Sequence, residues 1–235
     1  MPTVSQMALP LRLADHAVFA SFLEAGNEAL LATLRDLATG RADGGCWVWG
    51  PAASGKTHLL QAVCAQAGDR SVYVPLALLA DADAELLDGL ANRDLVCLDD
   101  LGAVAGRRDW ERALFVLCNQ ILDADVCLLV AADTSLRASR IVLPDLRSRL
   151  SRLPSFKIQP LADKERAAAL QLRARHRGLE LPDETARYLL SRSKRDMASL
   201  YDVLDKLDAE ALRAQRRLTI PFVREVLLER SSERE

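Results

Sequence analysis

Apolar and polar positions change their spacing twice along the chain. Between residue 45 and Pro160, short apolar runs alternate with longer segments in which apolar residues recur every three or four positions. The short runs are typical of buried strands and the longer segments of amphipathic helices. We expect strands at Cys46–Trp49, Val72–Leu76, Leu95–Leu98, Val126–Ala131 and Phe156–Gln159, and helices at Lys56–Ala67, Ala84–Ala91, Trp110–Leu122 and Asp145–Leu150. This alternation predicts a three-layer α/β domain with a parallel five-stranded sheet.

After Pro160 only helical spacing remains. We expect helices at Asp163–His176, Asp183–Ser193, Met197–Gln215 and Pro221–Glu229. Asp163 and Asp183 are placed to cap helix starts, Gly178 to end a helix, and Pro221 to lie in a first turn. The sequence therefore predicts a small all-helical domain that follows the α/β domain, with a boundary near Pro160.

Composition and charge narrow the class of protein. Of 235 residues, 50% are hydrophobic and 27% charged, which excludes disorder of the whole chain. The 31 basic and 33 acidic residues give a formal charge of −2, so no overall positive field attracts nucleic acid. The five cysteines form no C-x-x-C pair, and the chain has neither a secretory signal pattern nor an apolar run long enough for a membrane helix. We expect a cytoplasmic protein.

The strongest chemical signal is the segment Gly50–Thr57, which reads GPAASGKT and matches G-x-x-x-x-G-K-S/T. It lies between a predicted strand and a predicted helix, as a phosphate-binding loop must; a glycine-rich turn with an exposed lysine is the alternative. The glycines let backbone N–H groups turn toward phosphate oxygens. Lys56 is expected at the outer phosphates and Thr57 at Mg²⁺. The expected nucleotide-binding residues here are Gly50, Ser54, Gly55, Lys56 and Thr57.

Acidic residues follow two of the predicted strands. Asp99 and Asp100 come directly after Leu95–Leu98, at the edge where open α/β sheets bind ligands. Asp99 is expected to hold Mg²⁺, and Asp100 is a candidate catalytic residue that polarises an attacking water. Asp133 is a candidate sensor of the outer phosphate. A solvated turn or a helix cap is the other interpretation of these aspartates.

Three arginines, Arg147, Arg149 and Arg152, fall within one short predicted helical stretch. A charged, solvated face is one interpretation. The other is an arginine that enters the nucleotide site of a neighbouring protein, where it can raise hydrolysis about 10³- to 10⁵-fold. An exposed ion pair contributes only about 0–1 kcal/mol. The residues alone leave both interpretations open.

Together these features resemble the AAA+ module of the bacterial replication initiator DnaA, and more specifically the Hda family of DnaA-related regulatory inactivators. The similarity extends over nearly the whole chain. Its further segments are Phe19–Phe22, Gly26 with Asn27, Tyr73–Leu76, Leu143–Leu146, Leu170–Arg175 and Leu218–Val223. The resemblance implies a sliding-clamp-binding peptide at 1–12, an AAA+ α/β nucleotide-binding domain at 13–160 and a helical lid at 161–235. It also implies ADP or ATP, with Mg²⁺, as cofactors.

The resemblance gives the amino terminus a partner. Residues 6–11 look like the short peptide by which the family docks on the replicative sliding clamp, the beta subunit of the DNA polymerase. Pro10 stiffens an extended segment, Leu9 and Leu11 suit apolar pockets, and the Gln6 amide suits paired hydrogen bonds. A hydrophobic tail folded onto the domain is the alternative.

Three further site assignments come from the same resemblance. Arg149 occupies the position of an arginine finger that acts in trans on the ATP site of an adjacent DnaA. Phe19, Phe22 and Asn27 lie where the family approaches adenine. The lid arginine of the family is replaced by Ala198, and Arg195, one helical turn earlier, is the expected substitute at the nucleotide.

The implied function is negative regulation of replication initiation. The protein would dock on the DNA-loaded clamp, reach DNA only through it, and promote hydrolysis of ATP bound to DnaA. Its own hydrolysis is expected to be slow at most, self-association stays open, and no membrane contact is expected. Three alternatives remain: an autonomous ATPase of the helicase-loader type, a small-molecule kinase and a DNA-binding module, the last disfavoured by the charge balance.

Overall fold

Each predicted apolar run forms a strand of one parallel sheet in the computed structural model, which describes residues 17–192 and 196–232. The strands lie in the order β2-β3-β4-β1-β5. Their bounds are β1 Gly45–Trp49, β2 Ser71–Pro75, β3 Leu95–Asp99, β4 Cys127–Ala132 and β5 Ser155–Lys157. The predicted strands shift by one or two residues at their ends, because a strand ends where ladder hydrogen bonds end rather than where apolar residues do.

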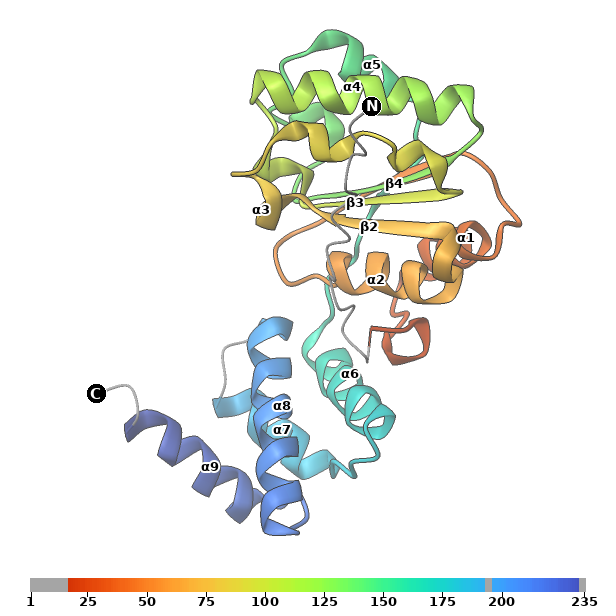
Figure 1. Cartoon of the computed structure of the whole chain (residues 1–235). Helices are drawn as coiled ribbons and strands as arrows, with labels where there is room; N and C mark the ends of the chain where they lie inside the picture. The colour runs from red at the N-terminus through yellow and green to blue at the C-terminus, as the bar shows by residue number, and fades with distance from the viewer. Residues whose placement is uncertain (1–16, 193–195, 233–235) are drawn as a thin grey trace, which may run out of the picture.

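Helices cover both faces of the sheet, as Figure 1 shows. On one face lie α1 (Glu28–Thr39) and α2 (Lys56–Ala67), and on the other α4 (Arg108–Asp123) and α5 (Pro144–Leu150). Successive β1 side chains enter different cores: Trp47 packs in the cluster with α4, and Val48 in the cluster with α1 and α2. Both side chains are fully buried, as expected for a strand inside a three-layer α/β domain.

The four carboxyl-terminal helices enclose a separate apolar core, below the sheet in Figure 1. They are α6 (Asp163–His176), α7 (Asp183–Arg192), α8 (Met197–Ala214) and α9 (Ile220–Ser232). Gly178, with φ +74°, follows the end of α6, and Pro221 lies in the first turn of α9, both as predicted. The fold class, an α/β domain with a parallel five-stranded sheet and a helical lid after it, is confirmed.

Three local predictions are wrong, the first two at Ala84–Ala91 and at Asp163. The helix expected at Ala84–Ala91 is replaced by two 3-10 turns, Ala84–Leu87 and Leu90–Asn92, because Gly89 between them has φ +79° and breaks the helical path. Asp163 is not a cap but the first residue of α6. Ala162 holds the cap position, and its N–H donates to the Glu165 carboxylate at 2.6 Å.

The caps of other elements add detail that the spacing missed. Asp183 is likewise the first helical residue of α7 rather than its cap, and its carboxylate pairs with Arg187 one turn later. Helix α1 was not predicted at all, although Leu30, Leu34 and Leu37 recur at helical spacing and are buried. Helix α1 therefore extends the helical layer on this face of the sheet to residues that precede the first strand.

All five cysteines are buried: Cys46, Cys64, Cys97, Cys118 and Cys127. Burial raises the pKa of the Cys46 and Cys118 thiols to about 12.

Within residues 17–192 and 196–232, no helix combines the length and the apolar character that a membrane crossing requires.

Candidate functional site

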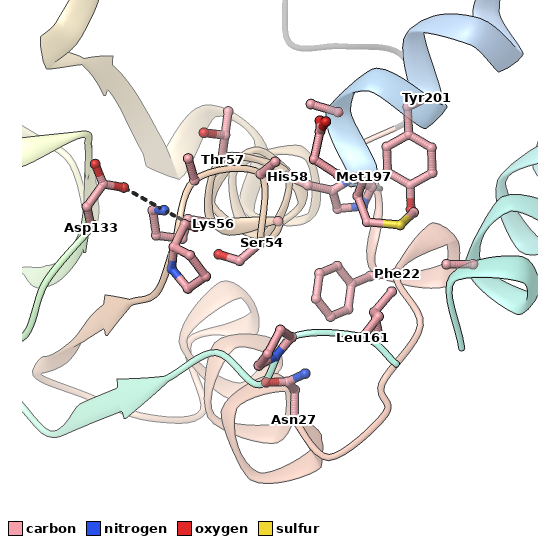
Figure 2. A pocket seen from close by; sticks show the side chains of 18 of the residues that line it. Phe22, Asn27, Ser54, Lys56, Thr57, His58, Asp133, Leu161, Met197 and Tyr201 are labelled. Carbon is pink, nitrogen blue, oxygen red and sulfur yellow. Dashed lines mark hydrogen bonds and ion pairs between the residues drawn. The ribbon is translucent and has the colours of Figure 1, made fainter. Parts of the chain in front are cut away.

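A pocket of about 1130 Å³ opens at the carboxyl edge of the sheet and is closed on one side by α6 and α8 of the lid. Figure 2 shows its lining, with the loop before α2 on one side and lid residues on the other. Parallel α/β sheets bind ligands at this edge, and a volume of this size is ample for a nucleotide. The pocket therefore lies where the sequence places its phosphate-binding loop.

The loop turns sharply between β1 and α2. Gly55, the last residue before α2, has φ +98°, a left-handed conformation that favours glycine. A Cβ atom there would lie 2.6 Å from Cε2 of Phe22, so the close approach of the aromatic ring also requires glycine. Ala53 adopts φ +59° in the same loop. The amino end of α2 consequently faces the pocket, and its unpaired N–H groups favour an anion.

Lys56 is held by three acceptors. Its ammonium donates to the carbonyl oxygens of Gly50 and Pro51 and to Oδ1 of Asp133, each at 2.9 Å. The side chain is only 5% exposed, whereas Asp133 is 67% exposed at the end of β4. Figure 2 marks the ion pair that joins them. The structure thus brings the predicted lysine and the predicted sensor aspartate together across neighbouring strands β1 and β4.

The hydroxyl of Ser54 tests whether the loop suits a phosphate. Its Oγ is buried and has no hydrogen-bond partner among the described residues. A Cβ atom on Gly50 would lie 3.1 Å from that oxygen, so the glycine leaves room beside it. A buried hydroxyl without a partner costs about 1–3 kcal/mol, and a phosphate oxygen would accept a hydrogen bond from it. The residues therefore fit a nucleotide phosphate.

The two acids after β3 have different surroundings. Asp99 is 2% exposed; its Oδ2 accepts the Tyr73 hydroxyl at 2.7 Å and its Oδ1 accepts the Asp100 N–H at 3.0 Å. Asp100 lines the pocket together with Thr57, whose side chain is exposed. Burial and the Asp99 charge raise the pKa of Asp100. Thr57 and Asp100 thus share the pocket, while Asp99 lies behind it and is oriented by Tyr73.

Aromatic and amide groups form the opposite end of the pocket. The Phe22 and His58 rings lie with centroids 5.7 Å apart. Asn27 is tied to the segment that leads into the lid: its Oδ1 accepts the Gln159 N–H at 2.8 Å, and its Nδ2 donates to the Gln159 carbonyl at 3.3 Å. Phe22 and Asn27 line the pocket as expected, but Phe19 lies in the core with α1 and α2.

The lid wall contains residues that the sequence reasoning missed. From α6 come Arg166 and Arg173, and from α8 Met197 and Tyr201, next to the predicted position Ala198. The Arg173 guanidinium lies 4.1 Å from the centre of the Tyr201 ring and 3.6 Å from Asp205, and burial lowers its pKa. Arg166 and Arg173 are seven residues apart in one helix and therefore lie on the same face, which the sequence alone indicates. Arg195 lies outside the described residues.

The arginines of α5 and of the turn that follows it do not line this pocket. Arg147 donates to the Ile141 carbonyl, whereas neither Arg149 nor Arg152 forms an ion pair with any residue that the structure describes. Arg149 is half-buried and its charge acts on Cys118 of α4. The predicted clamp-binding residues Gln6, Leu9, Pro10 and Leu11 lie outside the described part of the chain.

Comparisons with known proteins agree with this geometry. Residues 163–227 match the family model of the Hda lid domain. Domain III of the Thermotoga maritima replication initiation protein DnaA has a TM-score of 0.76 at 17% identity, over 93% of this chain and 98% of that one. AMPPCP-bound DnaA from Aquifex aeolicus has a TM-score of 0.68 at 22% identity, over 83% of this chain and 66% of that one.

A further similar structure is the replication initiator DnaA bound to AMPPCP and single-stranded DNA, with a TM-score of 0.70 at 21% identity. The match covers 86% of this chain and 69% of that one, so this chain spans about two thirds of the AMPPCP-bound DnaA chains. At these identities the solved structures establish the fold, and the family model adds the type of lid. The chain therefore shares its fold with domain III of DnaA, and its residues 163–227 match the Hda lid domain.

Proposed function

We propose that this protein is a negative regulator of replication initiation that acts in the cytoplasm. It binds an adenine nucleotide, docks on the DNA-loaded sliding clamp through residues 6–11, and promotes hydrolysis of ATP held by DnaA. The observation that carries the proposal is the contrast between a complete phosphate-binding loop in cis and an arginine, Arg149, that lies outside the pocket of its own chain. The Hda-type lid supports the choice of DnaA as the partner.

The chain's own nucleotide has a structural part in this proposal. With a nucleotide bound, Ser54 would donate a hydrogen bond to a phosphate oxygen and Lys56 would exchange its carbonyl acceptors for phosphate oxygens. Thr57 in the pocket and Asp99 behind it are the residues that would hold Mg²⁺. Bound Mg²⁺ supplies divalent charge that offsets the phosphate charge. Residues from both the sheet and the lid line the pocket, so a bound nucleotide stabilises one arrangement of the two. ADP suffices for this role.

Arg149 supplies the chemistry on the partner. A guanidinium presents up to five donors in a rigid fork and stays charged at any physiological pH, so it can bind the charge that develops on a transferring phosphoryl group. Without an ion pair to any residue that the structure describes, it is available to a neighbouring site. We propose this role for Arg149 rather than for Arg147, whose guanidinium is held by the Ile141 carbonyl.

The decisive experiment measures hydrolysis of DnaA-bound ATP with purified DnaA, clamp, DNA and this protein. We expect acceleration that requires the clamp, is lost in Arg149→Ala and persists in Arg152→Ala, the matched control on the same segment. No acceleration by the wild-type protein, or full acceleration by Arg149→Ala, contradicts the proposal. A variant with Gln6, Leu9 and Leu11 all changed to Ala tests clamp docking by direct binding to the clamp.

An autonomous ATPase of the helicase-loader type is the second candidate. The observation that favours it is the meeting of Lys56, Thr57 and Asp100 in one pocket, which is also the arrangement needed for hydrolysis in cis. Robust ATP turnover by the protein alone, abolished in Asp100→Asn and independent of DnaA, would support this candidate over the regulator.

A further inference from the structure

Glu111 is a buried carboxylate that the nucleotide pocket does not use. It lies in α4 and is 2% exposed. Its Oε1 accepts the N–H of Gly106 at 2.7 Å and of Val142 at 2.9 Å, and its Oε2 accepts the N–H of Leu143 at 2.7 Å and of Val142 at 3.1 Å. Three backbone amides from two separate segments therefore converge on one side chain.

These amides belong to two segments, one that follows Asp100 of the nucleotide pocket and one that begins α5, the helix of Arg149. Val142 and Leu143 directly precede Pro144, the first residue of α5, and Leu143 is its cap residue. Gly106 lies near the end of the segment that follows Asp100 and leads into α4. Glu111 thus joins the end of the Asp100 segment to the start of the helix that carries Arg149.

The position of α5 depends on such contacts. The helix has only seven residues, too few to be stable without tertiary contacts. Leu146 and Leu150 are buried and fix which face of the helix meets α4. Apolar packing is non-directional, whereas hydrogen bonds to a carboxylate fix distance and direction. The amides at the helix start are thus a directional constraint on its position along α4.

We propose that Glu111 is a positioning residue for Arg149. By holding the start of α5, it keeps the Arg149 guanidinium where it can reach the nucleotide of a partner molecule. The inference rests on the proposed function, since it assigns a task to Arg149. A displacement of about 1 Å can lower a rate by about 10²-fold, so a single lost anchor at the helix start has a large effect on partner hydrolysis.

The anchor is the set of hydrogen bonds from the Val142 and Leu143 amides to the Glu111 carboxylate. Two variants weaken it, one at the carboxylate and one at an amide. In Glu111→Gln, one carboxylate oxygen becomes an NH₂ group that faces the Val142 N–H in either orientation, together with that of Gly106 or of Leu143, a donor against a donor. Leu143→Pro deletes that N–H itself, and the observed φ of −72° suits proline. Asp109→Asn is the control for Glu111→Gln, because it removes an exposed carboxylate from the same helix turn. Leu143→Ala is the control for Leu143→Pro, because it shortens the side chain and keeps the N–H.

Two readouts follow each variant. The first is the maximal rate of DnaA-bound ATP hydrolysis at saturating protein and clamp. The second is hydrogen exchange at the Val142 and Leu143 amides, or at Val142 alone in Leu143→Pro. We expect both variants to lower the maximal rate at least tenfold and to speed exchange at the remaining amides, while ADP affinity stays unchanged. Asp109→Asn should match the wild type, and Leu143→Ala should lose far less rate than Leu143→Pro.

The outcomes separate this inference from the function beneath it. If the wild type does not accelerate hydrolysis, the proposed function fails; unchanged exchange in Glu111→Gln then also overturns the anchor. If Arg149→Ala loses the acceleration while Glu111→Gln and Leu143→Pro keep it, the role of Glu111 alone is overturned. Should Glu111→Gln not fold, the comparison of Leu143→Pro with Leu143→Ala decides by the same criteria.

Discussion

The phosphate-binding loop and helix α5 each carry a cation that we assign to a nucleotide, Lys56 and Arg149, and the two cations differ in how they are paired. Lys56 is buried and satisfied by two carbonyl oxygens and Asp133 within its own chain. Arg149 forms no ion pair with the residues that the structure describes. A cation that is compensated internally suits a ligand that the chain keeps, whereas an uncompensated cation at the surface suits a partner. The difference separates a site in cis from a residue that acts in trans.

The largest expected effect tests the residue assigned to act in trans. Arg149→Lys keeps the positive charge but loses the planar fork of donors. We expect the maximal hydrolysis of DnaA-bound ATP to fall about 10²-fold or more, about 3 kcal/mol of barrier, while the chain's own ADP affinity is unchanged. Single-turnover release of phosphate measures the rate. If Lys supports the full rate, charge alone suffices and the guanidinium has no special role.

The next effect tests the cis site. Lys56→Ala removes the cation beside Gly50, Pro51 and Asp133, and charged hydrogen bonds of this kind contribute about 1.5–3 kcal/mol. We therefore expect the affinity for ADP, measured with a fluorescent analogue, to fall about 10- to 100-fold. Lys206→Ala, an exposed lysine of α8, is the control and should bind as the wild type does. Unchanged ADP affinity in Lys56→Ala would place the nucleotide elsewhere.

A smaller effect tests the shape of the loop. Both Gly55 and Gly89 have left-handed φ values, and an alanine in that conformation costs about 1–2 kcal/mol. Only at Gly55 would the new methyl group displace the Phe22 ring, because at Gly89 the nearest atom is 3.6 Å away. We expect Gly55→Ala to lower both stability and ADP affinity, and Gly89→Ala to lower stability alone. Denaturant unfolding measures the stability of each variant, and titration measures its ADP affinity. Equal ADP affinities of the two variants would show that displacement of the Phe22 ring does not affect nucleotide binding.

The smallest effect concerns pH. The pKa of Asp100 is raised by burial and by Asp99, so ionised Asp100 destabilises the fold above that pKa, and this penalty vanishes as pH falls below its ordinary value of 3.8. Asp100→Asn should therefore raise the free energy of unfolding at neutral pH by about 0.5 kcal/mol, and asparagine tolerates the φ of +54°. The gain should shrink toward pH 3. Asp81→Asn, at an exposed site, should give no such pH-dependent gain.

Much of the fold could be predicted because strands buried on both faces leave continuous apolar runs. The loop Gly50–Thr57 could be predicted as well, since its residues are contiguous and its function depends on backbone turns. Gly89 defeated the predicted helix at Ala84–Ala91, because a single positive φ outweighs several favourable helix formers. Contiguous sequence patterns were thus sufficient to predict the strands and the loop, but not to exclude a helix that one residue of positive φ interrupts.

Other parts of the site depend on contacts between distant segments. Asn27 meets Gln159 across 132 positions, Phe22 covers Gly55, and Glu111 reaches Val142 and Leu143 across 31 and 32 positions. No spacing rule links such pairs, because tertiary packing decides which loops meet. The resemblance to a family located Arg149, but the anchor that holds its helix became visible only in three dimensions.

The buried cysteines give this protein a practical advantage for measuring its assemblies. Alkylation and maleimide coupling need an accessible thiolate, and none of the five native thiols is exposed. A single surface cysteine introduced at Ser148, an exposed residue of α5, would therefore be labelled selectively in the otherwise native protein. A dye or cross-linker at that position would report the distance to a bound partner directly, beside the arginine whose reach is in question.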